Sequence, residues 1–145
     1  MVHININCRD YARSKAFYEM LGFVEVWKVP ETNSPEVNAA VGMQDYQVNG
    51  AIMALQGAEP AMLIDLLEWQ QPRDNADPYP NLHRPGLARL ALRSSDLHSD
   101  YAFLVAEGVD VLSEPATVMS SANHGSRFFC FKDPDGTFLE LVESF

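Results

Sequence analysis

The chain opens with alternating polar and apolar residues. From residue 2 to residue 8, polar side chains at the odd positions alternate with apolar side chains at the even positions, which predicts a strand with one polar and one apolar face. Residues 12–21 then carry apolar side chains at helical spacing, and Gly22 follows them, as glycine commonly follows a helix end. Residues 23–29 predict the next strand.

The remainder of the first half predicts further strands. Residues 30–41 are polar and contain prolines, so we expect a loop with a short helix at 36–41. Strands are expected at 44–56 and 61–68, joined by a turn at 57–60. Residues 70–86 contain four prolines and no apolar periodicity, which is typical of a linker.

The second half predicts a similar series of elements. The expected elements are a strand at 87–93, a helix with Asp96 at its N-cap that ends before Gly108, a strand at 109–113, a loop at 114–126, and strands at 127–132 and 137–143 joined by a turn at 133–136.

The two halves also repeat one another in spacing. Twelve positions separate Asp10 from Gly22, and twelve separate Asp96 from Gly108. We therefore predict an α+β fold of two βαβββ modules, 1–69 and 87–145, joined by the linker 70–86 within one domain, with helices on the outer face and a ligand cavity at the junction. The matched polar positions at the strands of the two modules are His3, Asp65, Arg89 and Glu140.

Composition narrows the classes of function. The 145 residues are 47% hydrophobic and carry a formal net charge of −10, which disfavours binding to nucleic acid because a phosphate backbone repels such a surface. No apolar run approaches the roughly 20 residues of a membrane helix, and nothing resembles a secretion signal. We expect a cytoplasmic protein in which Cys8 and Cys130 are buried, reduced thiols.

Motifs at both ends resemble one superfamily. The spacing from His3 to Asp10, the Leu21-Gly22-Phe23 motif, and the Asp133-Pro-Asp-Gly136 turn followed by Glu140-Leu141 are similar to the vicinal oxygen chelate superfamily. This group includes glyoxalase I, bleomycin-resistance proteins, methylmalonyl-CoA epimerase and extradiol dioxygenases. The resemblance covers essentially the whole chain and implies a U-shaped mixed sheet around a cavity that takes a small molecule.

The resemblance also implies which residues would hold a metal. In metal-dependent members the ligands occupy the positions of His3, Asp65, Arg89 and Glu140. A guanidinium has no lone pair to donate, and Asp65 is one methylene shorter than the glutamate of the family. We therefore expect no cofactor; the alternative is one divalent zinc, nickel, manganese or iron ion held by His3, Asp65 and Glu140.

Three hypotheses about function remain open. In the first, a lyase or isomerase acts next to a carbonyl, with Glu140 as base, Arg89 stabilising an enediolate in place of one metal ligand, and His3 moving a proton or orienting the substrate. The second is a non-catalytic module that binds or sequesters a small molecule. The third is a metal-dependent lyase or extradiol-type dioxygenase, which the arginine disfavours. An inert, neutralised cluster would also explain the same four residues.

Other residues are candidates for contacts with the ligand. Asn5 and Phe138 share the inward faces by strand alternation, Asp65 adds a carboxylate, and His124 lies in a loop that could reach the mouth of the cavity. Neighbouring residues could equally satisfy Asn5, and His124 could be solvated. Exposed sheet edges favour pairing between subunits, so we expect a homodimer.

Overall fold

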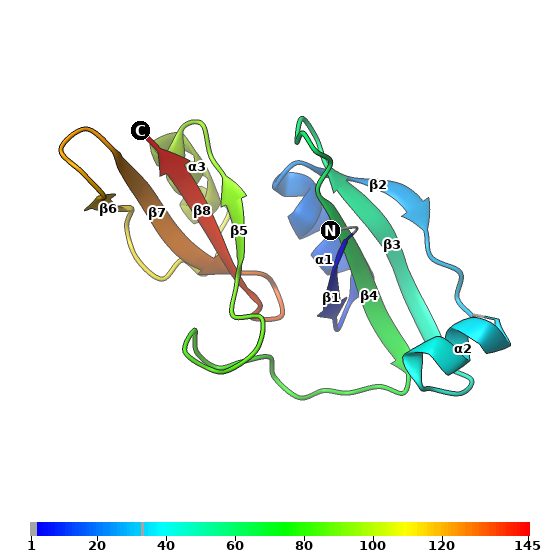
Figure 1. Ribbon diagram of the computed structural model, residues 1–145. Helices are drawn as coiled ribbons and strands as arrows, with labels where there is room; N and C mark the ends of the chain where they lie inside the picture. Colours follow the sequence, from blue (N-terminus) through cyan, green and yellow to red (C-terminus); the bar gives the residue numbers. More distant parts are fainter. Residues whose placement is uncertain (1–2, 33) are drawn as a thin grey trace. The chain divides into compact units, whose positions relative to one another are not determined.

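The computed structural model describes residues 3–32 and 34–145, so Val2, which the alternation assigns to the first strand, lies outside the described part (Figure 1). The chain divides into two compact units, unit 1 at residues 1–76 and unit 2 at residues 77–145. Each unit contains a four-stranded mixed sheet.

Unit 1 carries the first module and one additional helix. Its elements are β1 (Ile4–Cys8), α1 (Tyr11–Met20), β2 (Phe23–Lys28), α2 (Pro35–Val41), β3 (Gln47–Leu55) and β4 (Leu63–Gln71). The strand order is β1-β4-β3-β2; β1 is parallel to β4, and the other pairs are antiparallel.

Local sequence explains where the helices of unit 1 begin and end. The Asp10 side chain accepts a hydrogen bond from the Arg13 backbone N–H and caps α1. Ser34 caps α2 in the same way, and Gly42 ends α2 with a φ of 71°, a left-handed conformation that glycine adopts without strain.

The main core of unit 1 lies between α1 and one face of the sheet. The apolar even positions of β1 point into this core, together with side chains of α1, β2, β3 and β4. Its fully buried members include Tyr18, Phe23, Met53, Ile64 and Leu66. The opposite face of the sheet is not covered by α1; we call it the helix-free face of unit 1.

Unit 2 repeats the arrangement. Its elements are β5 (Leu90–Arg93), α3 (Leu97–Ala106), β6 (Ala116–Met119), β7 (Gly125–Lys132) and β8 (Phe138–Ser144). The strand order is β5-β8-β7-β6 with β5 parallel to β8. The fully buried side chains beneath α3 include Leu97, Leu104, Phe129, Phe131 and Leu139, and the opposite face of this sheet is the helix-free face of unit 2.

One predicted strand is in the wrong place. Residues 109–113 form only an isolated bridge between Val111 and Phe131, and the strand of this module is β6, inside the expected loop. Pro115, which has no N–H to donate, separates the two segments. All four residues of β6 are exposed, so its sequence lacks the alternation of polar and apolar residues that marks a half-buried strand. The α+β class and the two βαβββ modules are confirmed.

None of the helices in residues 3–32 and 34–145 is both long and apolar enough to cross a membrane.

Candidate functional site

Polar residues gather on the helix-free face of unit 1. Asn5 lies opposite Asp65 in the parallel pair of β1 and β4, and Asp65 lies opposite Ile52 on β3. Side chains at paired positions in adjacent strands share a face. Because the neighbours of Asn5 in β1, Ile4 and Ile6, point the other way, these residues face away from α1.

Asp65 is partly buried and only half satisfied. Asn5 Nδ2 donates to its Oδ2 at 2.9 Å, whereas the buried Oδ1 accepts no hydrogen bond from any described residue. Burial raises the pKa of Asp65, and the charge of His3 and the bond from Asn5 oppose that rise. Unit 1 therefore brings together three residues predicted from the sequence: His3, Asn5 and Asp65.

Sequence reasoning missed an aromatic pair on the same face. The rings of Tyr46 and Trp69 lie 5.1 Å apart, and Trp69 Nε1 donates to Asn7 Oδ1 at 2.9 Å. Burial and the nearby charge of Asp65 raise the pKa of Tyr46. Strand parity already groups Asn7 with Asn5 and Trp69 with Asp65, so a signal for these two was present. The strand predicted at 44–56 includes Tyr46, but β3 begins at Gln47 and leaves Tyr46 in the preceding loop.

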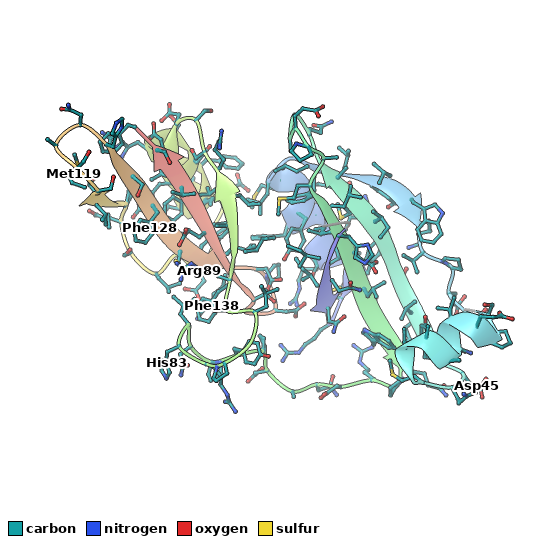
Figure 2. All side chains as sticks on the ribbon, viewed as in Figure 1. Asp45, His83, Arg89, Met119, Phe128 and Phe138 are labelled. Carbon is teal, nitrogen blue, oxygen red and sulfur yellow. The ribbon has the colours of Figure 1, made fainter. Side chains whose placement is uncertain are left out.

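An arginine and a glutamate pair on the helix-free face of unit 2. Arg89 Nε lies 2.7 Å from Glu140 Oε2; the arginine side chain is 42% exposed, and the glutamate side chain is 11% exposed. Figure 2 shows Arg89 at the beginning of β5, near the label of Phe138. The structure thus places two further predicted residues in direct contact and leaves the arginine side chain partly exposed.

Glu140 has a second partner that the sequence did not suggest. Cys130 lies opposite Glu140 in the register of β7 and β8. Its thiol donates a hydrogen bond to Glu140 Oε2, with a distance of 3.7 Å between Sγ and Oε2. Burial raises the pKa of the Cys130 thiol, and the charge of Glu140 raises it further. Because Oε2 already accepts from two groups, Oε1 is the oxygen that could take a proton from a substrate.

The two remaining candidates lie in different surroundings. Phe138 is buried and two residues from Glu140 on β8, so both share the helix-free face of unit 2, and Lys132 Nζ lies 5.6 Å from its ring centre. His124 is exposed in the turn between β6 and β7, where its carbonyl accepts hydrogen bonds from Ser120 and Ser121.

Asp65 and Glu140, two of the candidate metal ligands, already contact other side chains. In residues 3–32 and 34–145, no group of three or more histidines, cysteines, aspartates and glutamates is placed to hold a metal ion. In unit 1, Asn5 occupies one oxygen of Asp65. In unit 2, the position matched to His3 holds a guanidinium, which binds Glu140 itself and repels a cation.

Comparison with known proteins identifies the family. Residues 1–141 match the family described as the Glyoxalase/Bleomycin resistance protein/Dioxygenase superfamily. The chain belongs to this superfamily, as the paired modules and the motifs at both ends indicate. No curated protein matches the chain.

Solved structures show the same fold. A glyoxalase family protein from Bacillus cereus is 18% identical with a TM-score of 0.84, over 99% of this chain and 93% of that one. A glyoxylase/bleomycin resistance protein/dioxygenase domain from Frankia sp. EAN1pec is 19% identical with a TM-score of 0.72, over 100% and 91%. A glyoxalase family protein from Enterococcus faecalis is 27% identical with a TM-score of 0.60, over 99% and 96%.

Proposed function

We propose that the protein binds a small oxygenated molecule, such as a 2-oxo acid or a 1,2-dicarbonyl compound, through the guanidinium of Arg89 and without a metal ion. The observation that carries this proposal is the ion pair between Arg89 Nε and Glu140 Oε2, in which the acid is buried and the arginine remains 42% exposed. The pair holds the guanidinium in one orientation and leaves part of it open to a ligand.

The chemistry of the guanidinium supports an oxygen ligand. Arginine carries five N–H donors in a planar fork, and one carboxylate takes up at most two of them in a bidentate pair. At least three donors therefore remain after Glu140. Carboxylate, carbonyl and enolate oxygens fit these donors, because two N–H groups can hold adjacent oxygens together.

Calorimetric titration with phenylpyruvate tests the binding proposal. Wild-type protein, Arg89→Gln and Arg93→Gln are titrated in EDTA; the control removes the same charge from another exposed arginine on the strand that Arg89 precedes. A charged hydrogen bond contributes about 1.5–3 kcal/mol, so Arg89→Gln should weaken binding by roughly 10- to 150-fold. Equal losses in both variants would show only a general charge effect, and an unaltered Arg89→Gln would refute the proposal.

Proton transfer next to a carbonyl is the second candidate function. The observation that favours it is the unshared Oε1 of Glu140, beside a guanidinium that can stabilise an enediolate. Glu140 would remove the proton.

Hydrogen–deuterium exchange distinguishes binding from turnover. Phenylpyruvate is incubated in D2O with EDTA, and NMR follows exchange of its C3 protons above the rate without protein. An enzyme of this type should accelerate exchange, and Glu140→Gln should abolish the acceleration while Asp110→Asn, which changes an exposed acid of the same unit, leaves it intact. Binding without accelerated exchange would identify a non-catalytic module.

A further inference from the structure

Asp65 leaves one carboxylate oxygen without a partner. Asn5 satisfies Oδ2 at 2.9 Å, and the buried Oδ1 accepts from no described group. A buried acceptor without a hydrogen bond costs free energy, and the cost is greater for a charged group. A ligand that brings an N–H donor would remove this cost, so the site favours a donor over another acceptor.

The charge around Asp65 favours a cationic donor. Unit 1 contains ten aspartates and glutamates against five lysines and arginines. No described lysine or arginine of unit 1 forms an ion pair with Asp65, and Lys28 lies opposite Ala51, which points to the other face of the sheet. His3 is near enough for its charge to act on Asp65, but the structure records no ion pair between them.

Apolar side chains follow Asp65 along β4. Leu67 and Trp69 follow Asp65 at every second residue and share its face, so Trp69 lies about 13 Å from Asp65 along the strand. Gly50 lies opposite Leu67, and a Cβ there would be 2.7 Å from Leu67 Cδ2. Because β3 has no side chain at this point, Leu67 fills the space, and only 8% of Leu67 remains exposed.

The aromatic pair forms the far end of this row of side chains. Tyr46 packs on Trp69. Tyr46, Val48 and Leu67 form one buried cluster, and the partly exposed Trp69 packs against it. The hydrogen bond from Trp69 to Asn7 holds the indole in place. The face therefore has an acid at one end, an aliphatic middle and an aromatic far end.

We propose that this face binds an arylalkylammonium ion, whose N–H group donates to Asp65 Oδ1 while its apolar body extends along β4 towards the partly exposed Trp69. The proposal goes beyond the proposed function and does not depend on it, because Asp65 lies in unit 1 whereas Arg89 and Glu140 lie in unit 2. Oδ1 is covered in the free protein, so the amine must shift a neighbouring side chain, and His3 and Asn5 beside it both occupy exposed positions.

Calorimetry with two matched probes tests the inference. 3-Phenylpropylamine, which is protonated at pH 7, and 3-phenylpropanol share the same apolar body and differ in charge. In EDTA, which excludes binding through a metal, the wild-type protein should bind the amine roughly tenfold or more tightly than the alcohol, the effect of one charged hydrogen bond. Asp65→Asn should remove this preference.

A matched control separates recognition by Asp65 from general attraction to an acidic protein. Asp45→Asn removes one negative charge from the same unit at an exposed position, and asparagine tolerates its left-handed φ of 50°. This variant should retain the preference for the amine. If Asp45→Asn loses the preference as much as Asp65→Asn does, general electrostatics explains the binding, and the inference is overturned.

A second variant keeps the test independent of folding at Asp65. Trp69→Leu should weaken both probes by a similar factor and leave the amine-to-alcohol ratio unchanged. Equal affinity for the two probes, or no binding of either, would overturn the inference. Phenylpyruvate binding that depends on Arg89 and survives Asp65→Asn would show that the proposed function stands even where this inference fails.

Discussion

The ion pair of Arg89 and Glu140 allows a double-mutant cycle on protein stability. Among the described residues, Arg89→Gln leaves the buried carboxylate of Glu140 with the thiol of Cys130 as its remaining partner. Breaking a fully buried pair costs about 3–5 kcal/mol, whereas an exposed pair contributes about 0.2–1 kcal/mol. Because the arginine is 42% exposed and the glutamate 11% exposed, we expect a loss of about 1–3 kcal/mol, between these limits.

Urea unfolding of four proteins measures the coupling. Wild type, Arg89→Gln, Glu140→Gln and the double variant are unfolded at pH 7, and equal m-values indicate that the unfolded states are comparable. The double variant should lose less stability than the two single variants together, because the charge that Arg89→Gln leaves unpaired is absent from it.

Arg93→Gln serves as the control for charge alone. It removes an exposed arginine for which the structure records no ion pair among the described residues, so its effect should stay within about 0.5 kcal/mol, as for most surface substitutions. A coupling energy near zero, with Arg89→Gln no more destabilising than Arg93→Gln, would refute the reasoning that Arg89 compensates a buried charge.

Four further predictions concern the two units and the whole protein. Burial raises the pKa of Asp65, so the folded state holds this proton more tightly than the unfolded state does, and wild type should lose stability relative to Asp65→Asn as pH rises above about 4; urea unfolding at several pH values, with Asp45→Asn as control, measures this. Gly50→Ala should destabilise the protein by about 1–3 kcal/mol or more, because the added Cβ would lie 2.2 Å from the Leu66 carbonyl oxygen; an effect below that of Gly57→Ala, where nothing lies within 4 Å but φ is +74°, would contradict it. Elemental analysis of untagged protein should find substoichiometric zinc, nickel, manganese and iron, and one metal ion per chain that survives mild chelation would refute this expectation. Light scattering should find a homodimer, and a mass near 16 kDa at micromolar concentration would contradict it.

The spacing of polar, apolar and glycine residues predicted most of the fold, because the same spacing recurs in both halves of the chain. The alternation of β1 and the intervals from Asp10 and Asp96 to the following glycines predicted two βαβββ modules. The strand β6 escaped prediction because all four of its residues are exposed. Its place in the sheet comes from backbone hydrogen bonds to β7, which any sequence can make.

The sequence indicated candidate site residues, but it did not predict which side chains they contact. Strand parity indicated that His3, Asn5 and Asp65 share a face. The register of β1 and β4 places Asn5 opposite Asp65, and His3, which precedes β1, lies near enough for its charge to act on Asp65. The thiol of Cys130 contacts Glu140 because the register of β7 and β8 places the two residues opposite one another. The sequence of either strand alone does not determine this register. Tyr46 reaches the face from a loop, and its position depends on packing against Trp69.

The contacts of Glu140 limit how this site could evolve. A single substitution of Arg89 by a metal-binding histidine would leave the buried acid without the cation 2.7 Å away, while Cys130 would still engage the same oxygen. Such an intermediate would be less stable than either end point until a metal ion or a second substitution compensated the charge. A lineage carrying this arginine would therefore meet a stability barrier to this replacement, and adaptation to new ligands would proceed more readily through the residues around the pair than through the pair itself.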